Sequence, residues 1–403
     1  MSMLDMLTDE KVWQKFYRYK TSLVCTKSDI KRLESFINGR EYLAVCSAIK
    51  NKQPFPLPEK AVINKNHSNK KRIIYMYPEK ETIVLKLLTY LLTRKFDGIF
   101  AGNLYSFRPC KTAKDAVRRL INTPGIHSKY SYKADISNYF NSISINLLLP
   151  RLKKVLWDEP ELYDFLRGLL CVGEVIDRGK VISEEKGIMA GTPLSAFYAN
   201  LYLSELDKWF YERNIIYARY SDDIIVFASG ESELYEYSQH IKEQLAQNQL
   251  AINPDKECFA KPGDGFTFLG FRAETDKVDI APVTLSKLKG KMRRKTRALY
   301  RWSRKNHISG EKAAAAFIRI FNRKLLESPE KSELSWSYWF FSVITTDESL
   351  RLIDTYSQDC LRFLISGKRT KARFNVRYAD LKKLGYRSLV HEYYNVKAVP
   401  DKD

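Results

Sequence analysis

The spacing of apolar residues changes several times along the chain and predicts a mixture of helices and strands. Residues 1–50 carry apolar positions at helical spacing, and three prolines within residues 50–60 end that pattern. An alternating run at residues 70–77 predicts a strand, and the apolar residues that follow predict a core helix from about Glu79 to Phe96.

Strands and helices continue to alternate further along the chain. Residues 131–144 begin as a strand and turn into a helix, and residues 191–213 have helical periodicity. Residues 217–228 predict a hairpin of two apolar strands. A helix near residues 231–249 and one short strand at residues 266–274 are expected next.

Basic helices dominate from about Thr284 onward, and the expected domain boundary lies at Asp276–Pro282. Residues 286–306 contain many lysines and arginines and no acidic residue, with Tyr300 and Trp302 between them. This composition favours a helix that follows the phosphates of a nucleic-acid duplex. A solvated helix face is the alternative.

The net charge points to the same kind of partner. The 403-residue chain has 68 Lys and Arg against 47 Asp and Glu, which gives a formal net charge of +21. An excess of this size favours a polyanionic partner, with nucleic acid as the first candidate. A basic surface that serves only solubility is the alternative.

Other features indicate a cytoplasmic protein that does not enter a membrane. The six cysteines lie far apart, with no C-x-x-C pair, and are expected to be reduced and mostly buried thiols. The first residues lack an apolar signal core. The most membrane-like run, at residues 82–93, contains Lys86 and is too short to span a bilayer.

Two adjacent aspartates, Asp222 and Asp223, lie at the turn of the predicted hairpin. Asp is common in plain β-turns, so the pair alone is a modest signal. Asp135 ends another apolar strand, and pairing the two strands side by side in one sheet would bring Asp135 and Asp222 together. Such a cluster suits two Mg²⁺ ions, with Mn²⁺ as the alternative, and phosphoryl transfer as the chemistry.

A series of segments, in this order, resembles the motifs of the reverse transcriptases, within the bacterial lineage that includes group II intron, retron and phage-defence enzymes. The segments are KKRIIYMYPEKE, NLYSFRPCKTAKDAV, ADISNYF, GTPLSAFYANLYL, YSDD, LAINPDKE and FTFLGF. The resemblance runs from about residue 60 to 275. It implies an α+β right-hand polymerase with fingers, a palm built from an antiparallel sheet and helices, and an α-helical thumb.

The same resemblance divides the chain into domains. Residues 1–50 are expected to be an N-terminal helical extension, and residues 51–130 the fingers. The palm would span residues 131–275, with a fingers insertion at about residues 146–186. Residues 283–403 would form the basic helical thumb and the C-terminal region.

The resemblance also implies roles for the residues in the central motifs. Asp135 and Asp222 would be catalytic metal ligands, and the Ile136 carbonyl would be a third oxygen ligand. Asp223 would complete the catalytic and metal-binding group at its edge. Phe140 would pack beneath the sugar of the incoming nucleotide and favour dNTP over rNTP, with a plain core position as the alternative.

Further residues are expected to bind the incoming nucleotide. They are Lys71, Arg72, Arg108, Gly191, Thr192, Pro193, Ser195 and Lys256. Cationic donors suit a triphosphate, but Lys71 and Arg72 equally fit a solvated loop. Lys256 is a candidate proton donor to pyrophosphate, or else a surface lysine. Relatives commonly have glutamine where Ala190 stands, and this departure puts the ordinary grip on the substrate in doubt.

Primer and template contacts are expected from the last palm motif and the first thumb helix. The residues are Leu269, Gly270, Lys287, Lys291, Arg294, Arg297 and Arg301. The sequence does not indicate an oligomeric state.

Signatures that the sequence lacks exclude some classes of reverse transcriptase. The chain shows neither the N-A-x-x-H segment nor the V-T-G of retron enzymes, and has no length for a maturase region. The remaining class is the unknown-group, defence-associated one, which would copy a dedicated noncoding RNA into cDNA from dNTPs and a primer. Alternatives are a template-independent or protein-primed polymerase of abortive-infection type, a retron or group II intron-like enzyme, a viral-type RNA-directed RNA polymerase, and a non-enzymatic RNA-binding protein.

Overall fold

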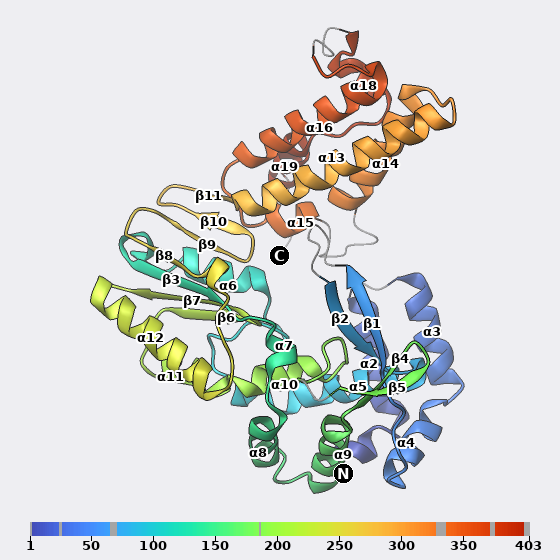
Figure 1. Cartoon of the computed structure of the whole chain (residues 1–403), viewed down its shortest axis with the longest axis vertical. Helices are drawn as coiled ribbons and strands as arrows, with labels where there is room; N and C mark the ends of the chain where they lie inside the picture. The colour runs from blue at the N-terminus through green and yellow to red at the C-terminus, as the bar shows by residue number, and fades with distance from the viewer. Residues whose placement is uncertain are drawn as a thin grey trace. The chain divides into compact units, whose positions relative to one another are not determined.

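The computed structural model divides into two compact units, which are described separately (Figure 1). Unit 1 comprises Met1–Asp264, and unit 2 comprises Gly265–Asp403. The structure describes residues 2–23, 26–64, 71–184, 187–327, 336–370 and 375–398.

Unit 1 mixes helices with two sheets. Its α-helices are α1 (Met3–Met6), α2 (Glu10–Ser22), α3 (Lys27–Asn38), α4 (Tyr42–Lys50), α5 (Glu79–Lys95), α6 (Ala113–Ile121), α7 (Tyr139–Ser142), α8 (Ile145–Val155), α9 (Pro160–Cys171), α10 (Ser195–Tyr202), α11 (Ser204–Glu212) and α12 (Glu231–Gln247). Its 3-10 helices are η1 (Asp97–Ile99), η2 (Ile126–Ser128) and η3 (Pro254–Lys256). Its strands are β1 (Glu59–Asn64), β2 (Lys71–Met76), β3 (Tyr130–Asp135), β4 (Glu174–Asp177), β5 (Lys180–Ser183), β6 (Tyr217–Tyr220), β7 (Asp223–Ala228) and β8 (Cys258–Ala260).

The central sheet of unit 1 is antiparallel, with the strand order β6-β7-β3-β8. Its middle strands are apolar because they are covered on both faces: Ile224, Ile225 and Val226 of β7 are all fully buried. Helix α12 packs against β3 and β7. The predicted hairpin at residues 217–228 is confirmed as β6 and β7.

The second sheet joins segments that are far apart in the sequence, in the order β2-β1-β4-β5. Strand β1 pairs antiparallel with β2 and parallel with β4, where Glu59 lies opposite Ile176. A further tie comes from the Tyr75 N–H of β2, which donates to the carbonyl oxygen of Ala190 at 2.9 Å. The hairpin β4–β5, within the segment expected as an insertion, therefore completes the sheet begun by β1 and β2.

Helices α1 to α5 also contribute buried side chains to the core of unit 1. Trp13 of α2 is fully buried and stacks on Tyr42 of α4, with 4.8 Å between the ring centroids. Leu85, Leu87 and Leu88 of α5 are also fully buried, so the apolar run within α5 is a core helix as expected. Across the described residues, every helix is too short or too polar to cross a bilayer.

Unit 2 combines a small sheet with a helical bundle. Its elements are β9 (Phe266–Phe268), β10 (Phe271–Ala273), β11 (Val278–Ile280), α13 (Pro282–Lys305), α14 (Gly310–Leu325), α15 (Trp336–Phe341), α16 (Glu348–Ser366), α18 (Tyr378–Lys383) and α19 (Leu389–Ala398). The strands pair antiparallel in the order β11-β10-β9, and α13, α14 and α19 all pack against α16.

The expectation of one short strand at residues 266–274 is wrong. The segment is a hairpin in which Phe268 pairs with Phe271 across a two-residue turn. The turn residues Leu269 and Gly270 have φ values of 49° and 90°, as the tightest hairpin turns require. The hairpin packs within unit 2, so the division between the units falls at Asp264–Gly265, before the predicted boundary.

The cysteines differ in part from the expectation. Those that the structure describes are all free thiols. Cys46 and Cys360 are buried, but Cys110, Cys171 and Cys258 are exposed, so the expectation of mostly buried thiols is wrong. The exposed cysteines lie in a loop, at a helix end and on an edge strand, where the chain covers them less.

Candidate active site

Three carboxylates meet at one end of the central sheet. Asp135 is the last residue of β3, and the strand register places it directly opposite Asp223, the first residue of β7. The N–H of Ile136 donates to the carbonyl oxygen of Asp222 at 2.9 Å, so the turn that carries Asp222 lies beside the end of β3. Like charges directly opposite one another destabilise a sheet, so this arrangement requires compensation.

The turn that carries Asp222 has a constrained backbone. Tyr220 pairs with Asp223, which leaves Ser221 and Asp222 as a two-residue turn. Ser221 has a φ of 60°, a conformation that hairpin turns usually give to glycine. Residues held in such conformations cost free energy and persist only where the surrounding contacts enforce them.

Two lysines compensate part of the negative charge. Lys256, at the end of η3, places its Nζ 2.5 Å from Oδ2 of Asp135. Lys133 of β3 lies 3.5 Å from Asp223, measured from Nζ to Oδ1. Burial raises the pKa of Asp222, and the charge of Asp135 raises it further. Burial also raises the pKa of Asp223, although Lys133 acts in the opposite direction.

The oxygen atoms of this group are of the type that binds divalent cations. Carboxylate and carbonyl oxygens are the ligands that Mg²⁺ and Mn²⁺ prefer. In the described ranges, however, no three His, Cys, Asp or Glu side chains are arranged to hold a metal ion. The Asp135 carboxylate faces Lys256 instead, and the Lys256 side chain is 51% exposed. Cation binding would therefore require that lysine to turn away into solvent.

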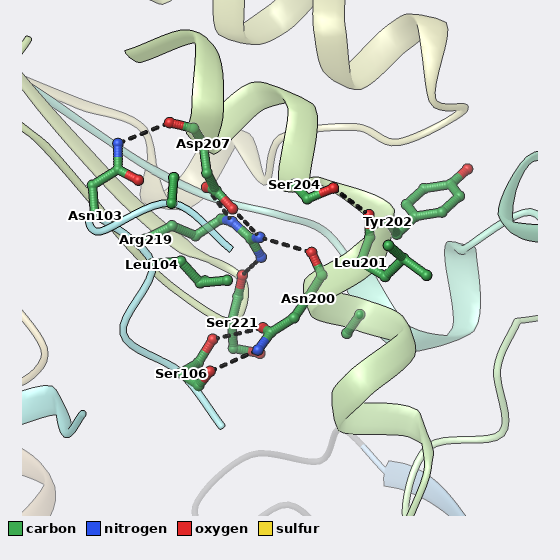
Figure 2. A network of polar contacts seen from close by, with 12 residues as sticks. Asn103, Leu104, Ser106, Asn200, Leu201, Tyr202, Ser204, Asp207, Arg219 and Ser221 are labelled. Carbon is green, nitrogen blue, oxygen red and sulfur yellow. Dashed lines mark hydrogen bonds and ion pairs between the residues drawn. The ribbon is translucent and has the colours of Figure 1, made fainter. Parts of the chain in front are cut away.

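A fully buried ion pair lies behind the turn (Figure 2). The side chains of Arg219 on β6 and Asp207 on α11 are both 0% exposed. The Arg219 Nε donates to Oδ1 of Asp207 at 2.8 Å, and the Tyr217 hydroxyl donates to the same oxygen at 3.0 Å. Burial opposes the charge on Arg219, but Asp207 outweighs it, so the pKa of Arg219 is raised.

The same guanidinium reaches the backbone of the turn. Its Nη1 donates to the carbonyl oxygen of Ser221 at 3.2 Å, and its Nη2 donates to the carbonyl oxygen of Asn200 at 3.4 Å. Figure 2 shows bonds from Arg219 to Ser221 in the turn, to Asn200 of α10 and to Asp207 of α11. Arg219 thus connects the backbone before Asp222 to two helices of the core.

Hydrogen bonds extend this network to the segment before Arg108. The side chain of Asn200 donates to the Ser106 carbonyl oxygen at 2.7 Å, and the Ser106 hydroxyl donates back to Asn200 at 3.0 Å. The side chain of Asn103 donates to the carbonyl oxygen of Asp207 at 2.9 Å. The segment is therefore fixed against β6 and α10 by side chains as well as by backbone.

Sequence reasoning missed this network, although two signals were present. Arg219 stands in a strand whose other residues are apolar or aromatic, and Asp207 occupies a core position of an amphipathic helix. A charged residue at a core position needs a partner of opposite charge. The two residues could have been paired on that ground.

Phe140 lies on α7, beside the carboxylate end of the sheet. Its half-buried ring contacts Phe107 edge to face, with 6.4 Å between centroids, and Phe107 lies 6.3 Å from the ring of Tyr220. A Cβ at Gly187 would lie 2.5 Å from the Phe140 carbonyl oxygen, so only glycine allows this approach. The position of the Phe140 ring is compatible with the expected contact to a sugar, which stays a prediction.

Residues 189–195 hold a tight turn beside β2. The Thr192 hydroxyl donates to the Met189 carbonyl oxygen at 3.0 Å, and the Ser195 hydroxyl donates to the Thr192 carbonyl oxygen at 2.7 Å. Both side chains are buried, whereas Gly191 is exposed and Pro193 half-buried. Nucleotide contacts from this turn, which stay a prediction, would therefore come from its backbone.

Arg108 has different partners from those expected. Its side chain is 6% exposed and binds Asp97 through Nε at 2.8 Å and Nη2 at 3.0 Å. It also donates to the carbonyl oxygens of Ala101 at 2.6 Å and Leu104 at 3.2 Å. These bonds hold the loop before α6, and contact with a triphosphate, which stays a prediction, would require them to break.

The remaining predicted residues are placed only in part. Lys71 and Arg72 begin β2, and their side chains lie outside the part of the chain that the structure describes. Leu269 and Gly270 form the β9–β10 turn of unit 2. The predicted basic residues of α13 are Lys287, Lys291, Arg294, Arg297 and Arg301. Their contact with primer or template stays a prediction.

Comparison with known protein families shows to which family this chain belongs. Residues 62–273, just over half of the chain, match the family described as "Reverse transcriptase (RNA-dependent DNA polymerase)". The chain belongs to the reverse transcriptase family. This match confirms the reverse transcriptase family that the motifs indicated, and the matched range contains all three carboxylates of the site. The α+β class with an antiparallel central sheet is likewise confirmed.

More distant similarities extend to yeast proteins. A curated relative, "Putative COX1/OXI3 intron 2 protein" of Saccharomyces cerevisiae, is 21% identical over 269 residues, which is 52% of this reverse transcriptase chain. The chain spans only 31% of that relative's length.

Two solved telomerase structures show a weak similarity to this chain, with TM-scores below 0.5. Apo telomerase from Candida tropicalis, truncated from its C-terminal domain, has a TM-score of 0.44 at 12% identity, covering 56% of this chain and 55% of that one. Telomerase from Candida albicans in complex with a fragment of telomeric RNA has a TM-score of 0.45 at 11% identity, covering 88% and 66%.

Proposed function

We propose that this chain is an RNA-directed DNA polymerase, which extends a primer by nucleotidyl transfer on an RNA template. The observation that carries the proposal is the position of Asp135 opposite Asp223, with the Asp222 turn held beside it. Membership of the reverse transcriptase family supports it. The formal net charge of +21 supports a nucleic-acid partner.

The residues of the site would divide the work as follows. Asp135 and Asp222, with the Ile136 carbonyl, would hold two divalent ions, Mg²⁺ or Mn²⁺, and Asp223 would complete the negative group. Such ions activate the primer 3′-hydroxyl and stabilise the leaving phosphates. Lys256 would leave Asp135 when a cation binds and remain near enough to donate a proton to pyrophosphate.

Two other groups of residues would select and hold the nucleotide. The ring of Phe140 would exclude ribonucleotides, because a 2′-hydroxyl would clash with it. The exposed Gly191 would allow the base pair to approach the backbone of the turn. Lys71, Arg72 and Arg108 are the candidate triphosphate ligands, and the basic face of α13 is the candidate duplex contact.

We further propose the setting of this activity. The motif pattern favours a bacterial enzyme of the defence-associated class that acts in the cytoplasm. It would copy a dedicated noncoding RNA into cDNA during phage infection. The support for this setting is that the given residues lack the N-A-x-x-H and V-T-G segments of retron enzymes.

A primer-extension assay tests the polymerase itself. The full chain is incubated with a homopolymer RNA template, a complementary DNA primer and dNTPs, with Mg²⁺, Mn²⁺ or a chelator. We expect extension that needs both the template and a divalent ion, and none with Asp222→Asn. Extension that continues without template would overturn RNA-directed synthesis and favour the template-independent alternative, which Ala190 in place of glutamine keeps open.

Sequencing the nucleic acid that copurifies with the chain tests the setting. One dominant small RNA, with complementary DNA that appears only when the aspartates are intact, is the expected result. DNA of simple repeated composition without a matching RNA would contradict it.

A further inference from the structure

A cavity of about 510 Å³ lies within unit 2, where α13 and α16 pack side by side (Figure 1). Residues of both helices and of the segment after α16 line it. The lining residues that bear on its chemistry are Arg293, Arg297, Tyr356, Arg362, Phe363 and Arg369. Sites for small ligands have volumes of about 300–1,000 Å³, so the cavity is large enough for one nucleotide.

The cavity uses a different side of α13 from the expected duplex contact. Lys289, Arg293 and Arg297 follow one another at every fourth residue and face α16. The other predicted contacts lie roughly a third of a turn away around the helix. They are Lys287, Lys291, Arg294 and Arg301. Helix α13 therefore carries two basic stripes, and Arg297 lies where they approach each other.

The cavity has an excess of positive charge. Arg362 pairs with Asp359 at 3.5 Å, and its Nε donates to the Val376 carbonyl oxygen at 3.3 Å. Arg293, Arg297 and Arg369 form no ion pair with any residue that the structure describes. Three guanidinium groups around one hollow attract an anion, and guanidinium binds phosphate oxygens through paired hydrogen bonds.

Aromatic rings line the same hollow. Tyr356 is half-buried, with the Nζ of Lys289 5.8 Å from its ring centroid. Phe363 contacts Tyr300 with 4.7 Å between centroids, and the guanidinium of Arg369 lies 5.0 Å from the Phe363 ring. Burial raises the pKa of Tyr356, and the positive charges of Arg293, Arg369 and Arg297 act in the opposite direction. Cations beside partly accessible aromatic rings are typical of sites for single-stranded nucleic acid.

We propose that this cavity binds one nucleotide of a single-stranded nucleic acid, with the phosphate held by Arg293, Arg297 and Arg369 and the base against Tyr356. The inference rests on the proposed function, since a reverse transcriptase handles both unpaired template RNA and newly made DNA. A base within a duplex is paired and stacked, so its face does not reach such a ring. The site would thus hold a strand outside the primer–template duplex.

Binding measurements on the full chain test the proposal without any need for catalysis. Fluorescence anisotropy is recorded with an unstructured RNA of about 12 nucleotides, a DNA of the same sequence, and the corresponding duplex, all at one salt concentration. The test variant is Arg293→Gln with Arg369→Gln. The matched control is Lys312→Gln with Arg319→Gln, which removes two exposed charges from α14 and leaves the cavity intact.

We expect the test variant to weaken single-strand binding by about tenfold and the control by less than about twofold. Binding of the duplex should weaken only slightly, and by the same factor, in the test variant and in the control variant. A larger loss with RNA would identify the template as the natural ligand, and a larger loss with DNA would identify the product. The proposed site would be overturned if the test and control variants lost the same amount of single-strand affinity. It would also be overturned if the test variant lost as much affinity for the duplex as for the single strand.

Tyr356 provides a second test, because the ring and the hydroxyl can be removed separately. Tyr356→Phe should keep single-strand binding, and Tyr356→Leu should weaken it about fivefold. Equal binding by both variants would overturn the assignment of the base to this ring. Thermal unfolding of each variant checks that the α13–α16 packing is intact.

Primer extension with the same proteins separates this inference from the proposed function. The wild-type chain could fail to extend a primer while the cavity variant still loses single-strand binding. That result would support the cavity site and reject the polymerase function. Normal extension by the wild-type chain, with unchanged single-strand binding in the cavity variant, would reject the cavity alone.

Discussion

The Nη1 atom of Arg219 lies 3.2 Å from the carbonyl oxygen of Ser221, the residue immediately before Asp222. The same side chain is fully buried against Asp207. A charged group that is enclosed in the core therefore holds the backbone of a turn at the surface of the site. The turn with the φ of 60° at Ser221 is thus held by a side chain two residues earlier on β6, which Asp207 of α11 fixes in place.

Replacement of the first carboxylate of the turn should abolish activity. Asp222→Asn keeps the size of the side chain and removes its charge, so metal binding is lost while the turn can still form. We expect primer extension to fall by at least about a thousandfold, because a bound metal stabilises the transition state by several kcal/mol. Asp255→Asn on the nearby η3, which is exposed, is the control and should keep its activity.

Removal of one partner of the buried pair should destabilise the fold. Arg219→Met leaves Asp207 buried and unpaired, which should lower the free energy of unfolding by about 3–5 kcal/mol. The double variant Arg219→Met, Asp207→Leu should recover most of that loss, since it leaves no unpaired charge. Chemical denaturation measures both.

The double variant also separates stability from catalysis. It still lacks the donor to the Ser221 carbonyl oxygen, so extension should fall by about 10–100-fold with an intact fold. Tyr217→Phe, which removes one bond to Asp207 and leaves the turn contact, is the control and should stay active. Full activity in the refolded double variant would show that Arg219 does not position the turn.

Lys256 and a divalent cation should compete for Asp135. Lys256→Gln removes the 2.5 Å ion pair, so the apo protein should bind Mn²⁺ several-fold more tightly, as measured by electron paramagnetic resonance of the free ion. Stability should change by less than about 1 kcal/mol, because the lysine is largely exposed. Unchanged Mn²⁺ affinity with a lower extension rate would instead favour the proton-donor role alone.

The ring of Phe140 should control the choice of sugar. Phe140→Ala should reduce the preference for dNTP over rNTP by about tenfold or more, through faster incorporation of ribonucleotides. The control Phe259→Val changes an exposed ring on β8 and should leave the preference unchanged. A loss of stability without any change in sugar preference would show that Phe140 is only a core residue.

The meeting of the three carboxylates could be predicted from sequence because Asp135 ends one strand, and Asp222 and Asp223 lie where the chain turns between two others. Strands such as β3 and β7 are buried on both faces and pair in the middle of a sheet, so their ends must lie together. The family resemblance then supplied the chemistry. The match over residues 62–273 confirms the family. The structure places Asp223 directly opposite Asp135, and the turn that carries Asp222 lies beside them.

Other parts of the site depend on contacts that no local pattern reveals. Lys256 reaches Asp135 only because the chain returns beside β3 after α12. Arg108 fitted a phosphate ligand by its motif, yet Asp97 and nearby carbonyl groups take its donors. The turn at Leu269 was missed because a leucine with positive φ has no sequence signal.

The parallel pairing of β1 with β4 has a consequence for how the chain is made. The hairpin β1–β2 leaves the ribosome early, but its sheet neighbour β4 and the Ala190 carbonyl that binds Tyr75 follow more than about a hundred residues later. Until then one edge of β1 stays unpaired, and unpaired strand edges attract other chains. The first sheet to be synthesised therefore stays incomplete until β4 and β5 have been made, and slowing translation before β4 should lengthen the time in which nascent chains can aggregate.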